Sequence, residues 1–166
     1  MKKTIYKALI ALFAAGIISA CGMPDPEVER TAVSALSGEW FIQYEYEDPP
    51  GSGTFVNPGW GHYKIITSNT AANIATEMLV DDHSAWGIKF KVAVSDMNFS
   101  ATAADELLDG EFPVTVTNGV VIKDGGKSRS GVVTDSISYE FVQPDLDPTL
   151  YRVIGHKRTG FLEDEF

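Results

Sequence analysis

Cysteine is scarce in this sequence, because Cys21 is the single cysteine among 166 residues. The chain therefore cannot form an intramolecular disulfide. Long apolar runs are scarce as well. The run at residues 8–18, which follows the bases of the N-terminus, is too short to span a bilayer, since a span takes roughly 20 apolar residues. A basic start, a short apolar run and small residues at 19–20 predict a secretory signal over residues 1–20, with an N-terminal membrane-anchor helix as the alternative.

The apolar run ends in Ile18-Ser19-Ala20-Cys21, which resembles the bacterial lipobox. The resemblance implies that Cys21 is diacylated and becomes the first residue of the mature protein, whereas the plainer interpretation leaves it as a free thiol. Gly22 follows, and by resemblance to Gram-negative sorting rules it implies the outer membrane. We therefore expect an acylated N-terminus and tether over residues 21–36, anchored by lipid in the bacterial cell envelope.

Positive charge is in short supply. The chain has 13 Lys and Arg residues against 23 Asp and Glu, so its formal net charge is −10. Removal of the signal takes Lys2, Lys3 and Lys7 with it and lowers this charge to −13. A surface this acidic repels nucleic acid and anionic lipid head groups, which excludes a DNA or RNA partner.

Long amphipathic helices are missing from the pattern, and short alternating segments take their place. In residues 38–46, Trp40, Ile42 and Tyr44 fall on one face, whereas the other face is polar except for Phe41. This two-residue period predicts a half-buried β-strand. Further strands are expected at residues 62–68, 73–80, 86–94, 99–102, 112–117, 120–123, 132–142 and 150–158.

The short turns between these segments predict an all-β fold, an antiparallel up-and-down barrel of about eight strands over residues 37–166. A barrel of that size is just wide enough for a packed interior or for one small ligand. The side chains expected to face the interior are apolar and aromatic: Trp40, Ile42, Tyr44, Ile74, Met78, Trp86, Phe90, Val92 and Tyr139.

Four segments break the strand pattern. Residues 48–61 are rich in proline and glycine and predict a long loop, whose Phe55 and Trp60 make it either a lid packed on the domain or an exposed binding lip. Residues 103–110 predict one turn of helix or a loop. Asn118-Gly119 is a strong signal for a two-residue hairpin. Residues 160–166 are expected to form a short acidic tail.

Gly38-Glu39-Trp40, at the start of the first strand, is similar to the Gly-x-Trp motif of lipocalins and other calycins. In that superfamily an Arg or Lys from the last strand packs over the tryptophan, and the candidates here are Arg152 and Arg158. Three longer stretches resemble the lipid-binding putative hydrolases, a family of bacterial lipoproteins: Leu36-Ser37-Gly38-Glu39-Trp40, Gly131-Val132-Val133-Thr134-Asp135-Ser136-Ile137 and Gly155-His156-Lys157-Arg158-Thr159-Gly160-Phe161. The resemblance implies a calycin-like barrel and an apolar ligand, and it carries over no catalytic residue.

Familiar signatures of catalysis are missing too. The chain has no Gly-x-Ser-x-Gly run, no phosphate-binding glycine loop and no EF-hand loop. Acylation of Cys21 would remove the one cysteine nucleophile. We therefore name no catalytic residue, and we expect neither a metal ion nor a cofactor.

Three histidines remain as candidates, because a catalytic triad is recognised by geometry rather than by chain order. His62 could serve as a base or ligand contact, or it could be a polar group at a strand start. His83, in an acidic turn, could bind a metal or be solvated. His156 could line the barrel mouth or be a satisfied histidine in the wall.

These observations leave three hypotheses. The first is a non-enzymatic outer-membrane lipoprotein whose barrel buries a small apolar or lipid-like ligand. The second is a lipid or ester hydrolase with a histidine-centred site, and the third is an accessory subunit of a cell-surface complex. A solid barrel interior would favour the third hypothesis over the first. The residues expected to contact a ligand are Trp40, Tyr44, Trp86, Phe90, Tyr139 and His156, with Trp60 and His62 at the mouth.

Overall fold

The computed structural model describes residues 29–82 and 84–166. The predictions made for the signal sequence, for Cys21 and for His83 lie outside the described residues. The folded part is the compact unit Thr31–Phe166. No helix among the described residues has the length and apolar character needed to cross a membrane.

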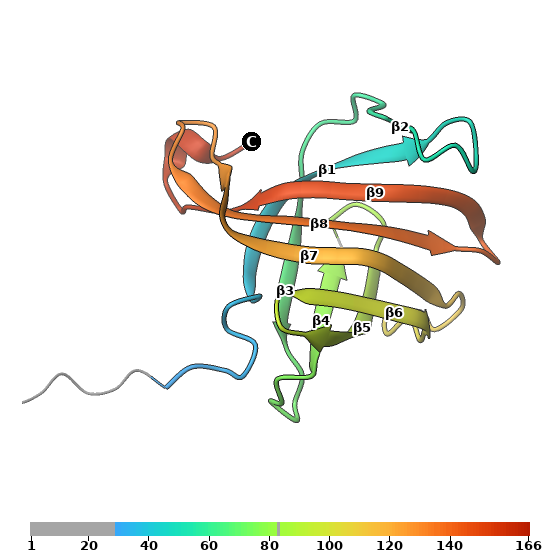
Figure 1. The fold of residues 1–166 in the computed structure, drawn as a ribbon, viewed down its shortest axis with the longest axis horizontal. Coiled ribbons are helices and arrows are strands. Elements are labelled where there is room, and N and C mark those ends of the chain that lie inside the picture. The colour runs from blue at the N-terminus through green and yellow to red at the C-terminus, as the bar shows by residue number, and fades with distance from the viewer. Residues whose placement is uncertain (1–28, 83) are drawn as a thin grey trace, which may run out of the picture. The chain divides into compact units, whose positions relative to one another are not determined.

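In the part of the chain that the structure describes, nine strands form one antiparallel sheet (Figure 1). Successive strands pair from β3 to β9, β1 pairs with β3, and a ladder between β1 and β9 closes the sheet on itself. Eight strands therefore make a closed barrel, and the two-residue β2 extends one edge of β1. The prediction of an all-β, up-and-down barrel of about eight strands is confirmed.

The strands are β1 (Gly38–Glu47), β2 (Phe55–Val56), β3 (Tyr63–Asn69), β4 (Glu77–Asp82), β5 (Ile88–Ser95), β6 (Asn98–Ala104), β7 (Val114–Lys127), β8 (Val133–Gln143) and β9 (Asp147–Lys157). A single 3₁₀ turn, η2 (Leu162–Asp164), follows them.

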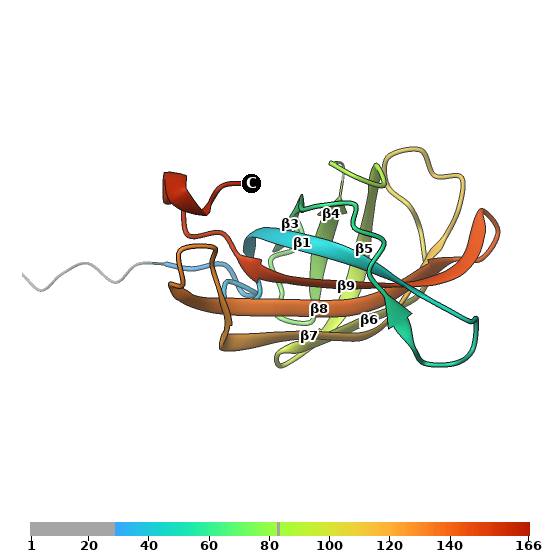
Figure 2. The same cartoon turned by 90° about the horizontal axis from the view of Figure 1, so that it is seen from above.

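Antiparallel pairing sends the connections to two opposite ends of the barrel. We call one the mouth end, which carries residues 48–62, 84–87, 105–113 and 144–146. We call the other the tail end, which carries residues 31–37, the remaining connections and the C-terminal residues 158–166. The described N-terminal segment, the β7–β8 turn and η2 all lie at the left in Figures 1 and 2.

Side chains that alternate inward fill the barrel along its length, and Trp40, Phe90 and Tyr139 are among the largest that are fully buried. The indole Nε1 of Trp40 donates a hydrogen bond to Thr67 Oγ1 at 2.8 Å, and the Thr67 hydroxyl donates to the Leu36 carbonyl at 2.5 Å. The buried indole is therefore satisfied, and Trp40 closes the tail end of a barrel whose middle is packed with side chains.

The cation over Trp40 is Lys157, so the prediction that Arg152 or Arg158 closes the barrel is wrong. Lys157 Nζ lies 5.4 Å from the centroid of the Trp40 ring, because these two residues are directly opposite each other in the β1–β9 ladder. Side chains alternate along a strand. Lys157 has the same inward parity as the buried Val153, whereas Arg152 has the opposite, outward parity, and Arg158 follows the end of β9 and is paired with Glu39 and Glu165.

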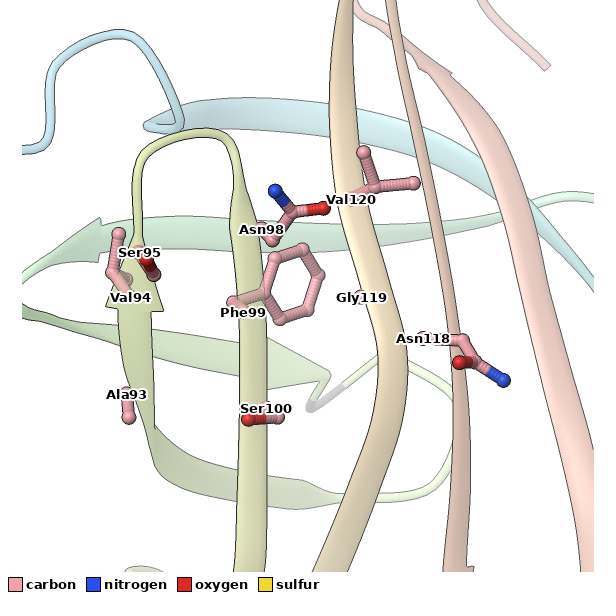
Figure 3. Close-up of a pocket in the computed structure, with 9 residues that line it drawn as sticks. All are labelled: Ala93, Val94, Ser95, Asn98, Phe99, Ser100, Asn118, Gly119 and Val120. Atoms are coloured by element: carbon pink, nitrogen blue, oxygen red, sulfur yellow. The ribbon is translucent and has the colours of Figure 1, made fainter.

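Strand β7 runs through Asn118-Gly119, so the hairpin predicted at this dipeptide is wrong. A register shift between Thr117 and Val120 marks a bulge instead. Gly119 allows the chain segment at Phe99 to lie against β7, since a Cβ at Gly119 would stand 2.3 Å from the Phe99 carbonyl oxygen (Figure 3). The glycine is needed here for a close approach between strands rather than for a turn.

Two short irregular segments precede β4 and β7. Ile74, expected inside the barrel, is exposed, because β4 begins only at Glu77 and Ile74 lies in the β3–β4 connection. Of residues 103–110, for which a helical turn or a loop was expected, 103–104 belong to β6 and 105–110 lie in the β6–β7 loop, so the loop alternative holds for most of the segment.

Candidate functional site

Six aromatic rings gather at the mouth end of the barrel. They come from Tyr44, Trp60, Tyr63, Trp86, Phe141 and Tyr151. Trp86 is at their centre, with its ring centroid 4.7 Å from that of Tyr151, 5.7 Å from that of Phe141 and 6.0 Å from that of Tyr44. The tilted and edge-on arrangements are those that aromatic pairs prefer. Strands and loops from both halves of the chain thus supply one apolar surface.

A cavity of about 220 Å³ opens among these rings, which we call the aromatic cavity, and its lining residues are Tyr44, Trp60, Tyr63, Ala85 and Trp86. Trp60 packs against Tyr151 with the ring centroids 6.5 Å apart, yet 49% of the residue remains exposed. The proline-rich loop is therefore a lid and a lip at once, because Trp60 both packs on the domain and borders an open cavity.

Tyr44 joins the aromatic cavity to a buried carboxylate. Its hydroxyl donates a hydrogen bond to Asp82, which is only 1% exposed. Burial raises the pKa of the Tyr44 hydroxyl far above its usual value, and the neighbouring Tyr139 and Asp82 raise it further. Burial raises the pKa of Tyr139 as well, with a contribution from Asp82. Both phenols therefore keep their protons at physiological pH, and Tyr44 is a hydrogen-bond donor rather than a nucleophile or a base.

A second cavity at the mouth end, of about 270 Å³, shares Trp86 with the aromatic cavity. Its other lining residues are Gly87, Ile88, Glu106, Asp109, Glu111, Phe112, Gln143 and Leu146.

The carboxylate of Glu106 is occupied by hydrogen bonds from backbone N–H groups, most of them in its own loop. It accepts hydrogen bonds from the backbone N–H groups of Lys89, Leu108, Asp109 and Gly110, with donor–acceptor distances of 2.6 to 3.0 Å. Burial alone raises the pKa of Glu106, but these four donors outweigh it and lower the pKa to about 2. Glu106 therefore stays ionised and organises the β6–β7 loop, so it is not available as a general acid.

His62 and His156 lie on the outer face of the barrel, beside the C-terminal residue. The His62 ring stacks on Phe166 with the centroids 3.7 Å apart, the His156 ring lies 6.1 Å from Phe166, and Phe41 packs on Phe166 at 5.1 Å. Burial lowers the pKa of both histidines, and the charge of Arg129 lowers that of His62 further. Neither histidine lines the aromatic cavity.

The polar groups beside the tail are bonded to one another and not to a histidine. Asp164 accepts hydrogen bonds from the Ser130 backbone N–H and from the Thr159 hydroxyl, both at 2.6 Å. Within residues 29–82 and 84–166, no serine hydroxyl is hydrogen-bonded to His62 or His156, and no cluster of three His, Cys, Asp or Glu side chains could hold a metal ion. The described residues therefore contain no assembled Ser–His pair.

The residues predicted from the sequence to contact a ligand fall into three places. Tyr44, Trp60 and Trp86 line the aromatic cavity, Trp40, Phe90 and Tyr139 pack the barrel interior, and His62 and His156 lie outside with the tail. Sequence reasoning missed Tyr63, Ala85 and Asp82. Tyr63 carried a usable signal, because it is a large aromatic residue directly after the loop that contains Trp60.

A larger hollow of about 530 Å³ lies where the β5–β6 turn meets the bulge of β7 (Figure 3). Its lining residues are Ala93, Val94, Ser95, Asn98, Phe99, Ser100, Asn118, Gly119 and Val120, and none of them titrates near neutral pH. The hollow is larger than the aromatic cavity, but none of these lining residues carries an acidic or basic side chain. The mouth end, by contrast, combines several aromatic rings, a buried carboxylate and open space. We therefore place the candidate site at the mouth end.

The family comparison agrees with the fold. A model of the family described as "Lipid-binding putative hydrolase" matches residues 25–162, which is most of the chain and all nine strands of the sheet. No curated protein matches this sequence. The protein therefore belongs to the family of lipid-binding putative hydrolases.

Proposed function

We propose that this protein is an outer-membrane lipoprotein that binds a small apolar or lipid-like ligand in the aromatic cavity. The observation that carries the proposal is the half-exposed Trp60, which stands over buried rings beside an open cavity. Large aromatic side chains bury much apolar area and fix a ligand's orientation with little loss of their own freedom. Membership of a lipid-binding family supports the same ligand class.

The size of the aromatic cavity limits what enters it. Its volume of about 220 Å³ is below the range of about 300–1,000 Å³ that is typical of sites enclosing a whole drug-sized ligand. The packed interior closes the path toward the tail end, because Trp40, Phe90 and Tyr139 fill the barrel there. The cavity thus takes one apolar end of a ligand, such as the end of an acyl chain, while the rest lies across Trp60.

The Tyr44–Asp82 hydrogen bond gives this apolar site a fixed polar boundary. Because the Tyr44 proton is committed to Asp82, an apolar group against the ring leaves no new donor unsatisfied. A ligand bearing an anionic group at its buried end would instead approach the buried Asp82 carboxylate, which repels it, and would lose its own hydration. Tyr44 therefore favours the apolar end of an amphiphile over its head group.

Probe binding by the full chain tests this proposal. A fluorescent fatty-acid probe should bind saturably, and Trp60→Ala should weaken its affinity about tenfold, because a large exposed ring leaves the site. Ile122→Ala is the control, since Ile122 has comparable exposure on β7, away from the cavity lining. Absence of saturable binding, or equal weakening by both substitutions, would contradict the proposal.

A second candidate is the accessory subunit of a cell-surface complex, and the packed barrel middle favours it. In that case the fold would present an outer surface to a protein partner instead of a cavity to a lipid. The probe experiment separates the two, because a filled barrel that acts only through its outer face gives no saturable binding. The hydrolase hypothesis gains no support from the described histidines, neither of which is hydrogen-bonded to a serine.

A further inference from the structure

The turn that ends the chain holds two large apolar side chains in water. Phe161 is 53% exposed and Leu162 is 89% exposed, at the start of η2. Leu162 is the most exposed large hydrophobic residue in the described part of the chain. Single exposed apolar residues are common on soluble proteins, so what matters is whether these two are held in place and whether they have apolar neighbours.

Hydrogen bonds hold the turn in place. Asp164 is buried and accepts from the Thr159 hydroxyl and the Ser130 backbone N–H. Arg158 donates to Glu165 Oε1 at 2.6 Å on one side and to Glu39 Oε2 at 2.7 Å on the other. The exposure of Leu162 is therefore a property of a fixed turn, and the fold presents this side chain to its surroundings.

The neighbouring β7–β8 turn, at the same end of the barrel, also exposes apolar side chains. The Ser130–Asp164 hydrogen bond ties the β7–β8 turn to η2, and the residues that follow Ser130 include Val132 and Val133, which are both exposed. Both turns lie at the tail end, at the left of Figures 1 and 2. Exposed large apolar residues on two linked turns at one end of a fold mark a place of contact with a partner or with lipid.

The N-terminal connection enters at this same end. Val33 and Leu36 are buried in the core there, and the Ala32 backbone N–H donates to Asn73 Oδ1 in the β3–β4 connection. Residue 31 is ten positions after Cys21, and ten extended residues span at most about 33–36 Å. An acyl anchor on Cys21 would keep the tail end within that distance of the bilayer surface.

We propose that the Phe161–Leu162 turn inserts into the interface of a lipid bilayer, so that the mouth end and its aromatic cavity point away from the membrane. This inference rests on the lipid anchor of the proposed function. The charges at this turn are mixed: Glu163 is exposed beside Leu162 and Arg129 is exposed on the β7–β8 turn, whereas Glu39 and Glu165 are paired with Arg158. A zwitterionic surface therefore fits the turn better than an anionic one.

Quenching by brominated lipid tests the contact. The full chain is attached to phosphatidylcholine vesicles whose acyl chains carry bromine, and Leu162→Trp is compared with the unsubstituted chain. The added indole should lose emission relative to the same chain on unbrominated vesicles. Leu108→Trp is the matched control, because Leu108 is an exposed leucine at the mouth end that lines neither of the two mouth-end cavities, and it should show no added loss. Unchanged emission at position 162, or equal loss at both positions, would overturn the inference.

Two further measurements separate this inference from the proposal on which it rests. Flotation of the chain with the vesicles and the mass of its N-terminus report the anchor, whereas quenching reports the turn. A chain that floats without quenching at position 162 overturns the inference alone, and a chain that does not float contradicts the lipid anchor as well. In the unsubstituted chain, amide hydrogen exchange of residues 159–165 should slow on vesicles, and unchanged exchange there would also count against insertion.

Discussion

Lys157 holds the tail end of the barrel closed with both parts of its side chain, the charged amine and the aliphatic stem. Its Nζ lies 5.4 Å from the Trp40 ring centroid and 3.4 Å from the Asp135 carboxylate. Its aliphatic stem lies against Gly38, where a Cβ would stand 2.7 Å from Lys157 Cε. The glycine and the tryptophan of the Gly-x-Trp motif therefore have one physical reason: together they form the surface on which this lysine packs.

Replacing this lysine should separate its charge from its packing. Lys157→Met keeps an unbranched apolar stem and should destabilise the fold by about 0.5–1 kcal/mol, the usual size of a partly exposed cation–π contact. Lys157→Ala should cost more, because the stem over Trp40 is lost too. Urea unfolding measures both, with Lys123→Met as the control for removing an exposed lysine charge. A Lys157→Met variant as stable as the parent would show that the charge contributes nothing here.

Side-chain alternation identifies this cation once one inward-facing residue of the last strand is known. Val153 is fully buried in the structure, and counting by twos from it arrives at Lys157. Arg152 falls on the other parity, and Arg158 lies beyond the end of the strand. The calycin resemblance admits an Arg or a Lys, and the strand period alone does not choose between them, because Val153 and Ile154 are both apolar and leave the inward face of this strand open.

At the scale of elements, the two arginines of the last strand region fasten two separate segments. The Arg152 guanidinium lies 4.2 Å from the centroid of the Phe55 ring and is paired with Glu45, so it holds the β1–β3 loop that carries Trp60. Arg158, by contrast, ties the tail to β1 through Glu165 and Glu39. Cations that do not close the barrel therefore determine which loops lie against it.

Amide hydrogen exchange should distinguish these two attachments. Arg152→Ala should speed exchange in residues 48–61 and leave residues 159–165 unchanged, because it removes the cation against Phe55 and the pair with Glu45 but not the hydrogen bonds that hold the tail. Arg158→Ala should do the reverse, so each variant is the control for the other. If either substitution loosened both segments equally, the arginines would be acting through the stability of the whole fold and not through local contacts.

Element boundaries were predictable to the extent that alternation alone determines them. Strands β1, β5, β8 and β9 were expected within a few residues of their observed ends, because one face of each is buried. The hairpin expected at Asn118-Gly119 is wrong, because the same dipeptide occurs both in tight turns and where two strands approach closely. Phe41, the apolar exception on the outer face of β1, is explained by Phe166, whose ring packs against it. No local pattern announces a contact between residues so far apart in the chain.

At the scale of the whole molecule, the candidate site is a product of barrel closure. Its rings come from β1, from the loop before β3, from the first residue of β3, from the residue pair before β5 and from β8 and β9. Sequence reasoning found three of the five cavity-lining residues by treating large aromatics as wall residues, but it treated Phe90 and Tyr139 in the same way, and these are packed in the core. Alternation tells whether a side chain faces inward, and only the closed barrel tells how far from its end that side chain lies.

At the scale of the whole molecule, the lowered pKa values of several partly buried groups predict that the fold loses stability in acid. Burial lowers the pKa of His62 and His156 below the ordinary value of 6.5, so the unfolded chain binds these protons more readily and stability falls as pH drops through 6.5. Glu106 has a pKa of about 2 in the fold against 4.5 for an ordinary glutamate, so its stabilising contribution is complete above pH 4.5 and is lost between 4.5 and 2. Asp164, whose pKa is also lowered because its hydrogen-bond donors outweigh its burial, acts in the same direction.

Urea unfolding between pH 8 and pH 3 should therefore show stability that declines in two stages, gently below about pH 6.5 and steeply below about 4.5. Glu106→Gln should cost about 1–3 kcal/mol at pH 7, because backbone donors in the β6–β7 loop lose an ionised acceptor. It should also flatten the steep stage. Glu111→Gln, at an exposed position in the same loop, is the matched control and should leave both stages unchanged. A Glu106→Gln chain that keeps the full acid dependence of the parent would show that the loop carboxylate is not what ties this fold to neutral pH.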